Sequence, residues 1–172
     1  MAIVGLFFGS DTGNTEAVGK MIQKKLGKKM VDVKDIAKST KEEIAEFDLL
    51  ILGIPTWYYG ENQCDWDDFL PDLEEVDFTD KLVAIFGLGD QLGYAEWFQD
   101  AVGMLHDELL ILGCDVVGYW PNQGYEFDAS KALTEDKSFF VGLCLDDENQ
   151  YDLTDERINN WCNQLIAEIK LL

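Results

Sequence analysis

The most chemically distinctive stretch of the sequence is a loop rich in glycine and hydroxyl side chains. It reads Gly9-Ser10-Asp11-Thr12-Gly13-Asn14-Thr15, and it follows an apolar run and precedes a segment with helical periodicity. The N–H groups of a first helical turn have no partners within the helix, and the helix dipole favours negative charge there. This loop therefore predicts a phosphate cradle, although a capped turn without a ligand fits the motif about equally well.

The loop lacks the lysine that a nucleoside-triphosphate loop would carry. That loop reads G-x-x-x-x-G-K-[ST], with the lysine on the outer phosphates and the hydroxyl on magnesium. Here Asn14 stands where the lysine would be, and Asp11 lies inside the loop. This composition favours one terminal monophosphate held by neutral donors, without a metal ion.

Two further loops carry aromatic side chains. One reads Pro55-Thr56-Trp57-Tyr58-Tyr59-Gly60 and follows an apolar run, and the other contains Leu88-Gly89-Asp90, with Tyr94 shortly after it. Trp57 and Tyr94 could form two walls of a slot, in which each aromatic pair gains roughly 0.5–1.5 kcal/mol beyond area burial. A surface patch for protein contact, or simple core filling, is the alternative. The neighbouring phosphate cradle favours the slot.

Alternating strands and helices are predicted to position these loops. Apolar runs predict strands over residues 2–8, 30–33, 49–54, 81–86, 115–119 and 139–145. Helical periodicity predicts helices over residues 15–26 and 94–112, and a short helix or turn over 65–73. Two further helices are predicted, one beginning after a cap at Ser39 or Thr40 and the last after a cap at Thr154.

This alternation predicts a three-layer α/β/α fold with a five-stranded parallel sheet of order 2-1-3-4-5. The ranges 115–119 and 139–145 count as two parts of the fifth strand. The 172 residues of the chain suit a single domain spanning residues 1–172. In that strand order the ligand lies at the carboxyl ends of strands 1 and 3. The three distinctive loops begin at that edge of the sheet.

The segment 118–138 departs from the regular winding. It is too long for an ordinary loop and too rich in aromatic residues for a disordered linker. We therefore expect an ordered insertion that interrupts the last strand, which resumes at Phe139. An excursion without a partner is slightly favoured over a docking role.

Charge and composition exclude several classes of function. The net charge of -21 excludes a phosphate-backbone binder. It indicates basic protein partners, although a merely soluble surface explains it too. The sequence contains no run of about 18 apolar residues, so no membrane-spanning segment is predicted. Four scattered cysteines and one histidine, His106, do not form a zinc or iron–sulfur pattern. Free thiols indicate a reducing cytoplasm.

A phosphate at one end and a flat ring at the other describe FMN, and the motifs resemble those of bacterial long-chain flavodoxins. The shared motifs are residues 10–15, 55–60, Gly89-Asp90-Gln91 with Tyr94, Asp146 within 145–150, and 153–157. The 118–138 segment corresponds to the feature that separates long from short chains. The likeness covers essentially the whole sequence.

The resemblance implies non-covalent FMN with a role for each motif. Residues 10–15 would hold the phosphate, Trp57 would stack on the inner face of the ring and Tyr94 on the outer face. The Leu88-Gly89-Asp90 loop and Gln99 would meet the pyrimidine edge. Thr56 and Asp146 would contact the ribityl chain, and Pro55 belongs to the same cofactor-binding loop as Thr56. The Tyr58–Tyr59 peptide, followed by Gly60, would reorient to offer its carbonyl to flavin N5.

The resemblance further implies a low-potential one-electron carrier that cycles between semiquinone and hydroquinone, with no catalytic or metal-binding residues. Its partners would be an NADP(H)-dependent flavodoxin reductase and low-potential oxidoreductases, met by a monomer in transient complexes. A flavin enzyme such as a quinone reductase is one alternative. A phosphorylated receiver domain is another, but it needs an acceptor aspartate where this chain has Gly53-Ile54-Pro55.

Overall fold

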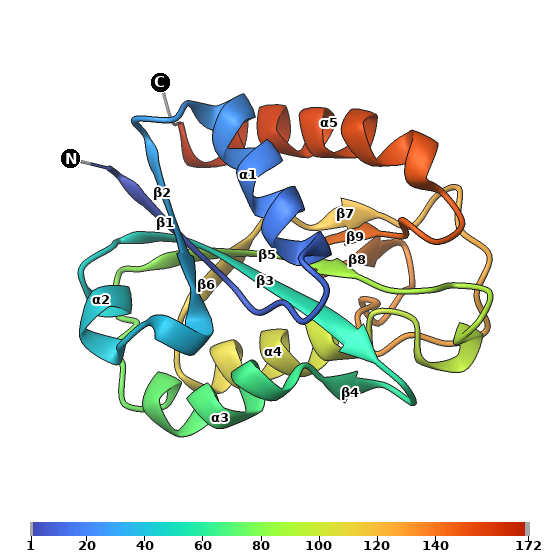
Figure 1. The fold of residues 1–172 in the computed structure, drawn as a ribbon, viewed down its shortest axis with the longest axis horizontal. Coiled ribbons are helices and arrows are strands. Elements are labelled where there is room, and N and C mark those ends of the chain that lie inside the picture. The colour runs from blue at the N-terminus through green and yellow to red at the C-terminus, as the bar shows by residue number, and fades with distance from the viewer. Residues whose placement is uncertain (1, 171–172) are drawn as a thin grey trace.

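The computed structural model describes residues 2–170, and a parallel β-sheet forms its centre (Figure 1). The strand order is β2-β1-β3-β5-β6, which confirms the predicted 2-1-3-4-5 winding. These strands are β1 (Val4–Phe8), β2 (Val31–Asp35), β3 (Leu49–Trp57), β5 (Leu82–Leu88) and β6 (Asp115–Val117).

The fifth position of the sheet is divided between two short strands. β6 pairs with Leu82–Ala84 of β5, and β9 (Leu143–Leu145) pairs with Phe86–Leu88 of the same strand, both in parallel. The expected interruption is therefore confirmed, but the expected restart at Phe139 is wrong. Phe139–Phe140 instead forms β8, which pairs antiparallel with β7 (Trp120–Pro121), so the sheet strand resumes only at Leu143.

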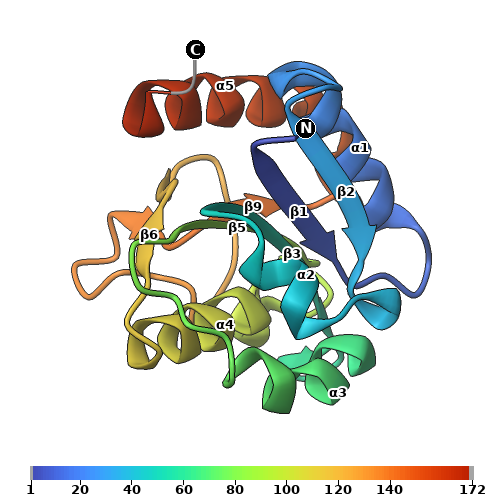
Figure 2. The ribbon, with the colours of Figure 1, turned by 90° about the vertical axis from the view of Figure 1, so that its left-hand side faces the viewer.

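Helices cover both faces of the sheet (Figure 2). α1 (Asn14–Leu26) and α5 (Tyr151–Ile169) lie together on one face. α2 (Lys41–Ala45), α3 (Cys64–Leu73) and α4 (Asp100–Ile111) lie on the other. Short 3-10 turns, η1 (Ile36–Lys38) and η2 (Ala95–Trp97), complete the connections. No helix in residues 2–170 is both long and apolar enough to cross a membrane.

Strand side chains alternate between two hydrophobic cores. In β1, Phe7 belongs to the same buried cluster as Trp66 of α3 and Leu105 of α4, whereas Leu6 belongs to a second cluster, with Trp161 of α5. A strand that is buried on both faces needs apolar residues at every position. This is the reason that the apolar runs of the sequence located the central strands correctly.

Tertiary contacts change the bounds of several predicted elements. β2 starts and ends later than the expected 30–33, and β3 continues through Trp57 because its end pairs with β4 (Glu61–Asn62). The helix expected over 94–112 is broken before α4, where Gln99 adopts a left-handed φ of 60°. The last helix begins at Tyr151, so Thr154 is not its cap; its hydroxyl lies 2.5 Å from Asp147 Oδ1.

Candidate cofactor-binding site

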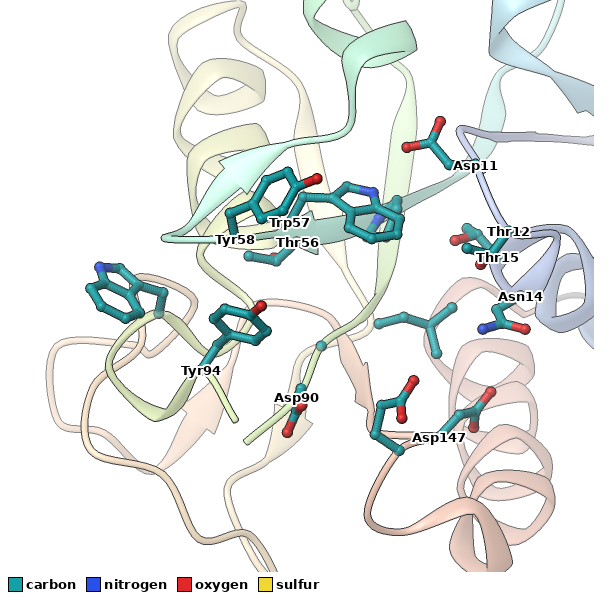
Figure 3. A pocket seen from close by; sticks show the side chains of 15 residues that line it. Asp11, Thr12, Asn14, Thr15, Thr56, Trp57, Tyr58, Asp90, Tyr94 and Asp147 are labelled. Atoms are coloured by element: carbon teal, nitrogen blue, oxygen red, sulfur yellow. The ribbon is translucent and has the colours of Figure 1, made fainter. Parts of the chain in front are cut away.

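A cleft of about 200 Å³ opens at the carboxyl edge of the sheet, where four loops meet (Figure 3). Its walls come from the loops that follow β1, β3, β5 and β9. The residues that line it are Asp11, Thr12, Asn14, Thr15, Pro55, Thr56, Trp57, Tyr58, Leu88, Gly89, Asp90, Tyr94, Trp97, Asp147 and Glu148. The structure thus brings together the three loops that the sequence singled out.

The loop after β1 forms one end of the cleft. Gly13 precedes α1 with a left-handed φ of 88°, and its N–H donates to Ser10 Oγ at 2.9 Å. Ser10 and Gly13 shape the turn and lie outside the lining, whereas Thr12, Asn14 and Thr15 face the cleft. Their hydroxyl and amide groups, together with the free N–H groups of the first helical turn, suit an anion.

The β3–β4 hairpin supplies the aromatic end. Trp57 pairs with Glu61, and residues 58–60 form the turn between them. Tyr58 lines the cleft with a left-handed φ of 45°. Tyr59 is outside the lining and packs against Trp97 in an edge-to-face arrangement, with 4.9 Å between the ring centroids. Gly60 completes the turn at φ 85° without lining the cleft.

Trp57, the last residue of β3, and Tyr94, in the loop after β5, flank the opening (Figure 3). Tyr94 is 40% exposed, so its ring is accessible to a ligand in the cleft. The indole Nε1 of Trp57 is buried and has no hydrogen-bond partner in the described chain. A buried donor without an acceptor is costly, so its position at the cleft indicates a ligand with acceptor atoms.

Asp90 faces the cleft, but its carboxylate is committed to its own loop and to Asn149 of the loop after β9. Asp90 Oδ1 accepts hydrogen bonds from Leu92 N at 3.1 Å, Gly93 N at 2.7 Å and Asn149 Nδ2 at 2.7 Å. Burial acts to raise the pKa of Asp90, but these hydrogen bonds outweigh it and hold the pKa below its usual value. Asp90 therefore stays ionised and fixes the shape of the loop.

Two residues expected to touch the cofactor lie behind the wall of the cleft. Asp146 and Gln99 are both 0% exposed and outside the lining. Asp146 accepts five hydrogen bonds from Gln91, Glu148 and Asn149. Gln99 Nε2 donates to Leu145 O at 2.9 Å. The structure thus gives both side chains a supporting position behind the lining.

Three lining residues were missed from the sequence. Trp97 comes three positions after Tyr94, and Asp147 and Glu148 directly follow Asp146. A second aromatic residue beside Tyr94 was an available indication for Trp97. The run of adjacent acids gave no indication of which side chains would point into the cleft.

Comparison with known proteins assigns the family. Residues 6–161 match the family model described as flavodoxin. The chain belongs to the flavodoxin family.

Flavodoxin relatives match along nearly the full length. The flavodoxin of Haemophilus influenzae is 60% identical over 171 residues, which cover 99% of this chain and 98% of the relative. Flavodoxin 1 of Escherichia coli is 58% identical, with 99% and 97% covered. The crystal structure of Fusobacterium nucleatum flavodoxin bound to flavin mononucleotide superposes with a TM-score of 0.90 at 33% identity, covering 98% of this chain and 99% of that one. Flavodoxins are electron-transfer flavoproteins, so the receiver-domain alternative is excluded.

Proposed function

We propose that this flavodoxin holds FMN without a covalent bond and carries single electrons at low potential between redox proteins. One observation carries the proposal: a single cleft combines hydroxyl groups and a helix start at one end with Trp57 and Tyr94 at the other. That combination suits a ligand with a phosphate at one end and a flat ring at the other. Among curated relatives and solved structures, flavodoxins match the chain, and one of them is bound to flavin mononucleotide.

The residues present fit FMN. Thr12, Asn14 and Thr15 would hold the phosphate with neutral donors, and Ser10 and Gly13 would keep their loop in shape. The unpaired Nε1 of Trp57 supports this fit, since a phosphorylated polyol chain offers acceptors to a buried donor. Trp57, Tyr94 and Tyr58 would enclose the ring, and Thr56, with the loop from Leu88 to Asp90, would line the space between ring and phosphate.

When bound, FMN supplies the one-electron chemistry. The chain contributes charge: Asp11, Asp90, Asp147 and Glu148 all line the cleft, and none of its lining residues, all within the described chain, is a lysine or arginine. One negative charge about 10 Å from the ring, at an effective dielectric constant of about 20, repels a second negative charge placed on the ring by roughly 1.7 kcal/mol. These carboxylates therefore lower the potential at which the second electron enters.

The hairpin turn contributes an adaptable backbone acceptor. Tyr58 and Gly60 both have left-handed φ values, 45° and 85°, around the Tyr58–Tyr59 peptide. Glycine tolerates such values, so this peptide can turn its carbonyl toward the ring edge at low cost. A carbonyl there would accept a hydrogen bond from flavin N5 when that nitrogen carries a proton.

The proposal extends to the domain organisation, the partners and the cellular location of the protein. We propose one domain over residues 1–172 of the long-chain type, with 118–138 as its insertion, acting as a monomeric carrier without catalytic residues. The net charge of -21 supports basic partners, including an NADP(H)-dependent flavodoxin reductase and low-potential oxidoreductases. Four free cysteines support a reducing cytoplasm.

Stepwise reduction of the purified protein tests this function. Dithionite titration should resolve two one-electron steps. The one-electron-reduced form should accumulate near the midpoint of the titration, where its absorption can be measured. A single two-electron step would contradict a carrier role. Rapid bleaching of the flavin by NADPH alone would favour a quinone-reductase-like enzyme instead.

A further inference from the structure

The side chain of Gln63 connects the loop after β1 to the start of α3. Gln63 is 0% exposed and immediately precedes that helix. Its Nε2 donates to Asp11 Oδ1 at 3.0 Å and to Asp65 Oδ2 at 2.7 Å. A side-chain amide nitrogen has two hydrogens, so both are used on these carboxylates.

The other side of the same amide supports the loop at Gly9. A Cβ atom added to Gly9 would lie 2.2 Å from Gln63 Oε1 and 2.7 Å from Trp66 Cδ1. The backbone of the loop therefore rests directly on these two buried side chains. Gln63 Oε1 has no hydrogen-bond partner among residues 2–170, so the amide donates without accepting.

The placement of Asp11 matters because its carboxylate lies in an anion-binding loop. The carboxylate of Asp11 points away from Thr12 and Thr15 in Figure 3. Ligand atoms of Asp11, Cys64 and Asp65 lie within 4.8 Å of one another, which gathers negative charge at the start of α3. Burial, and then the carboxylates of Asp65 and Asp11, raise the pKa of the Cys64 thiol, as expected for such a corner.

We propose that Gln63 is a positioning residue for the FMN phosphate. It holds the Asp11 carboxylate outside the anion position and fixes the loop backbone at Gly9. Gln63 lies outside the cleft lining, so it acts through Asp11 and the loop. This inference rests on the proposed function, since it assumes that the loop binds the phosphate of FMN.

The Gln63→Glu variant tests the inference because it keeps the size of the side chain and replaces both donors with an acceptor. Asp11 and Asp65 then lose their donor and face a third carboxylate. Affinities of the apoprotein for FMN and for riboflavin, which lacks the phosphate, are measured by flavin fluorescence quenching. We expect FMN affinity to fall at least about tenfold and riboflavin affinity to change less than about twofold.

Further variants separate positioning from a general structural role. Adding Asp11→Asn to Gln63→Glu should restore FMN affinity about threefold or more, because the new amide can donate to the introduced carboxylate. Gln63→Met, which adds no charge, should lose less affinity for FMN than Gln63→Glu and again leave riboflavin affinity nearly unchanged. It replaces Gln63→Glu in the test if that variant fails to fold. Gln123→Glu adds the same charge at an exposed position and should leave both affinities unchanged.

The outcomes distinguish this inference from the proposed function. Equal losses of FMN and riboflavin affinity in both Gln63 variants, or unchanged FMN affinity, would overturn the positioning role. Wild-type protein that binds FMN no more tightly than riboflavin would instead overturn the phosphate site itself.

Discussion

The buried carboxylate of Asp146 accepts two hydrogen bonds from Gln91, one from its backbone nitrogen at 3.1 Å and one from its Nε2 at 2.7 Å. This pair joins the loop after β9 to the loop after β5. Asn149 strengthens the junction by donating to both Asp90 and Asp146, and Gln91 Oε1 accepts from Glu126 N at 2.5 Å. Two walls of the cleft and the insertion are therefore held by one polar network.

Replacing Asp146 with alanine should lower the free energy of unfolding by about 3 kcal/mol, because it leaves several buried donors without an acceptor. Urea unfolding of the apoprotein measures the effect. Asp152→Ala, at an exposed position of the same region, is the matched control and should cost at most about 0.5 kcal/mol. Similar losses in the two variants would show that the network does not stabilise the fold.

Removing the aromatic walls should weaken FMN binding. We expect Trp57→Ala to lower FMN affinity about 100-fold and Tyr94→Ala about tenfold, since Trp57 buries more surface and supplies the unpaired Nε1. Titration of the apoprotein with FMN measures both. Tyr151→Ala removes a tyrosine that is 74% exposed and outside the cleft, so it should leave affinity unchanged. Wild-type affinity in both wall variants would rule out the slot.

The hairpin glycine should be sensitive to substitution beyond its backbone angle. Gly60→Ala imposes a left-handed φ of 85° on alanine and places Cβ 2.7 Å from Asp100 Oδ2. We expect a loss of about 2 kcal/mol in unfolding free energy and a several-fold loss of FMN affinity.

Gly113→Ala provides the control for that experiment, because Gly113 has φ 82° and nothing within 4 Å of its added Cβ. It should cost about 1 kcal/mol through the backbone angle alone and leave FMN affinity intact. If the two alanine variants bind FMN equally well, the hairpin turn does not shape the cleft.

The single histidine should make stability depend on pH near neutrality. Burial lowers the pKa of His106 below 6.5, against the opposing effect of Asp107, and its Nε2 lies 2.5 Å from Tyr119 OH. The unfolded chain then binds the proton more tightly than the folded protein. The contribution of His106 to the free energy of unfolding is fully present above about pH 6.5, and it is lost as the pH falls through the lowered pKa of the folded state.

Urea unfolding at several pH values, for wild-type protein and His106→Gln, checks this dependence. The wild type should lose more stability than the variant as the pH falls from about 7 to about 5. An NMR titration of the one histidine reports its pKa directly. A value at or above 6.5 would contradict the burial argument.

The sheet and its three loops could be predicted because their causes are local. Buried parallel strands require apolar residues on both faces, as Leu6 and Phe7 illustrate by packing into opposite cores. Once the strand order is known, the switch point determines which loops meet. Glycines and aromatic residues in those loops then indicate the kind of ligand.

The break before α4 could not be predicted, because distant contacts determine it. Phe98, Val102 and Leu105 have helical spacing, yet Gln99 is left-handed. Phe98 N donates to Ala129 O at 3.3 Å, and Gln99 Nε2 donates to Leu145 O, both far away in the sequence. These contacts outweigh the local preference for helix.

The buried position of Asp146 could not be predicted from the sequence, for a similar reason. Asp146, Asp147 and Glu148 are adjacent acids, and any of them could face a ligand. Gln91 and Asn149 supply the donors that draw Asp146 inward, which leaves Asp147 and Glu148 in the lining. Pairings across the fold therefore decide which carboxylate is structural.

The divided fifth strand also determines when the protein can acquire its cofactor. β9 precedes the wall formed by Asp147 and Glu148, and it pairs with β5 only after the chain has passed through the whole insertion. Closing that longer loop costs more entropy than docking β6. A chain still emerging from the ribosome has a phosphate loop and Trp57 but lacks the last wall. The cleft is therefore completed only after nearly all of the sequence has been synthesised.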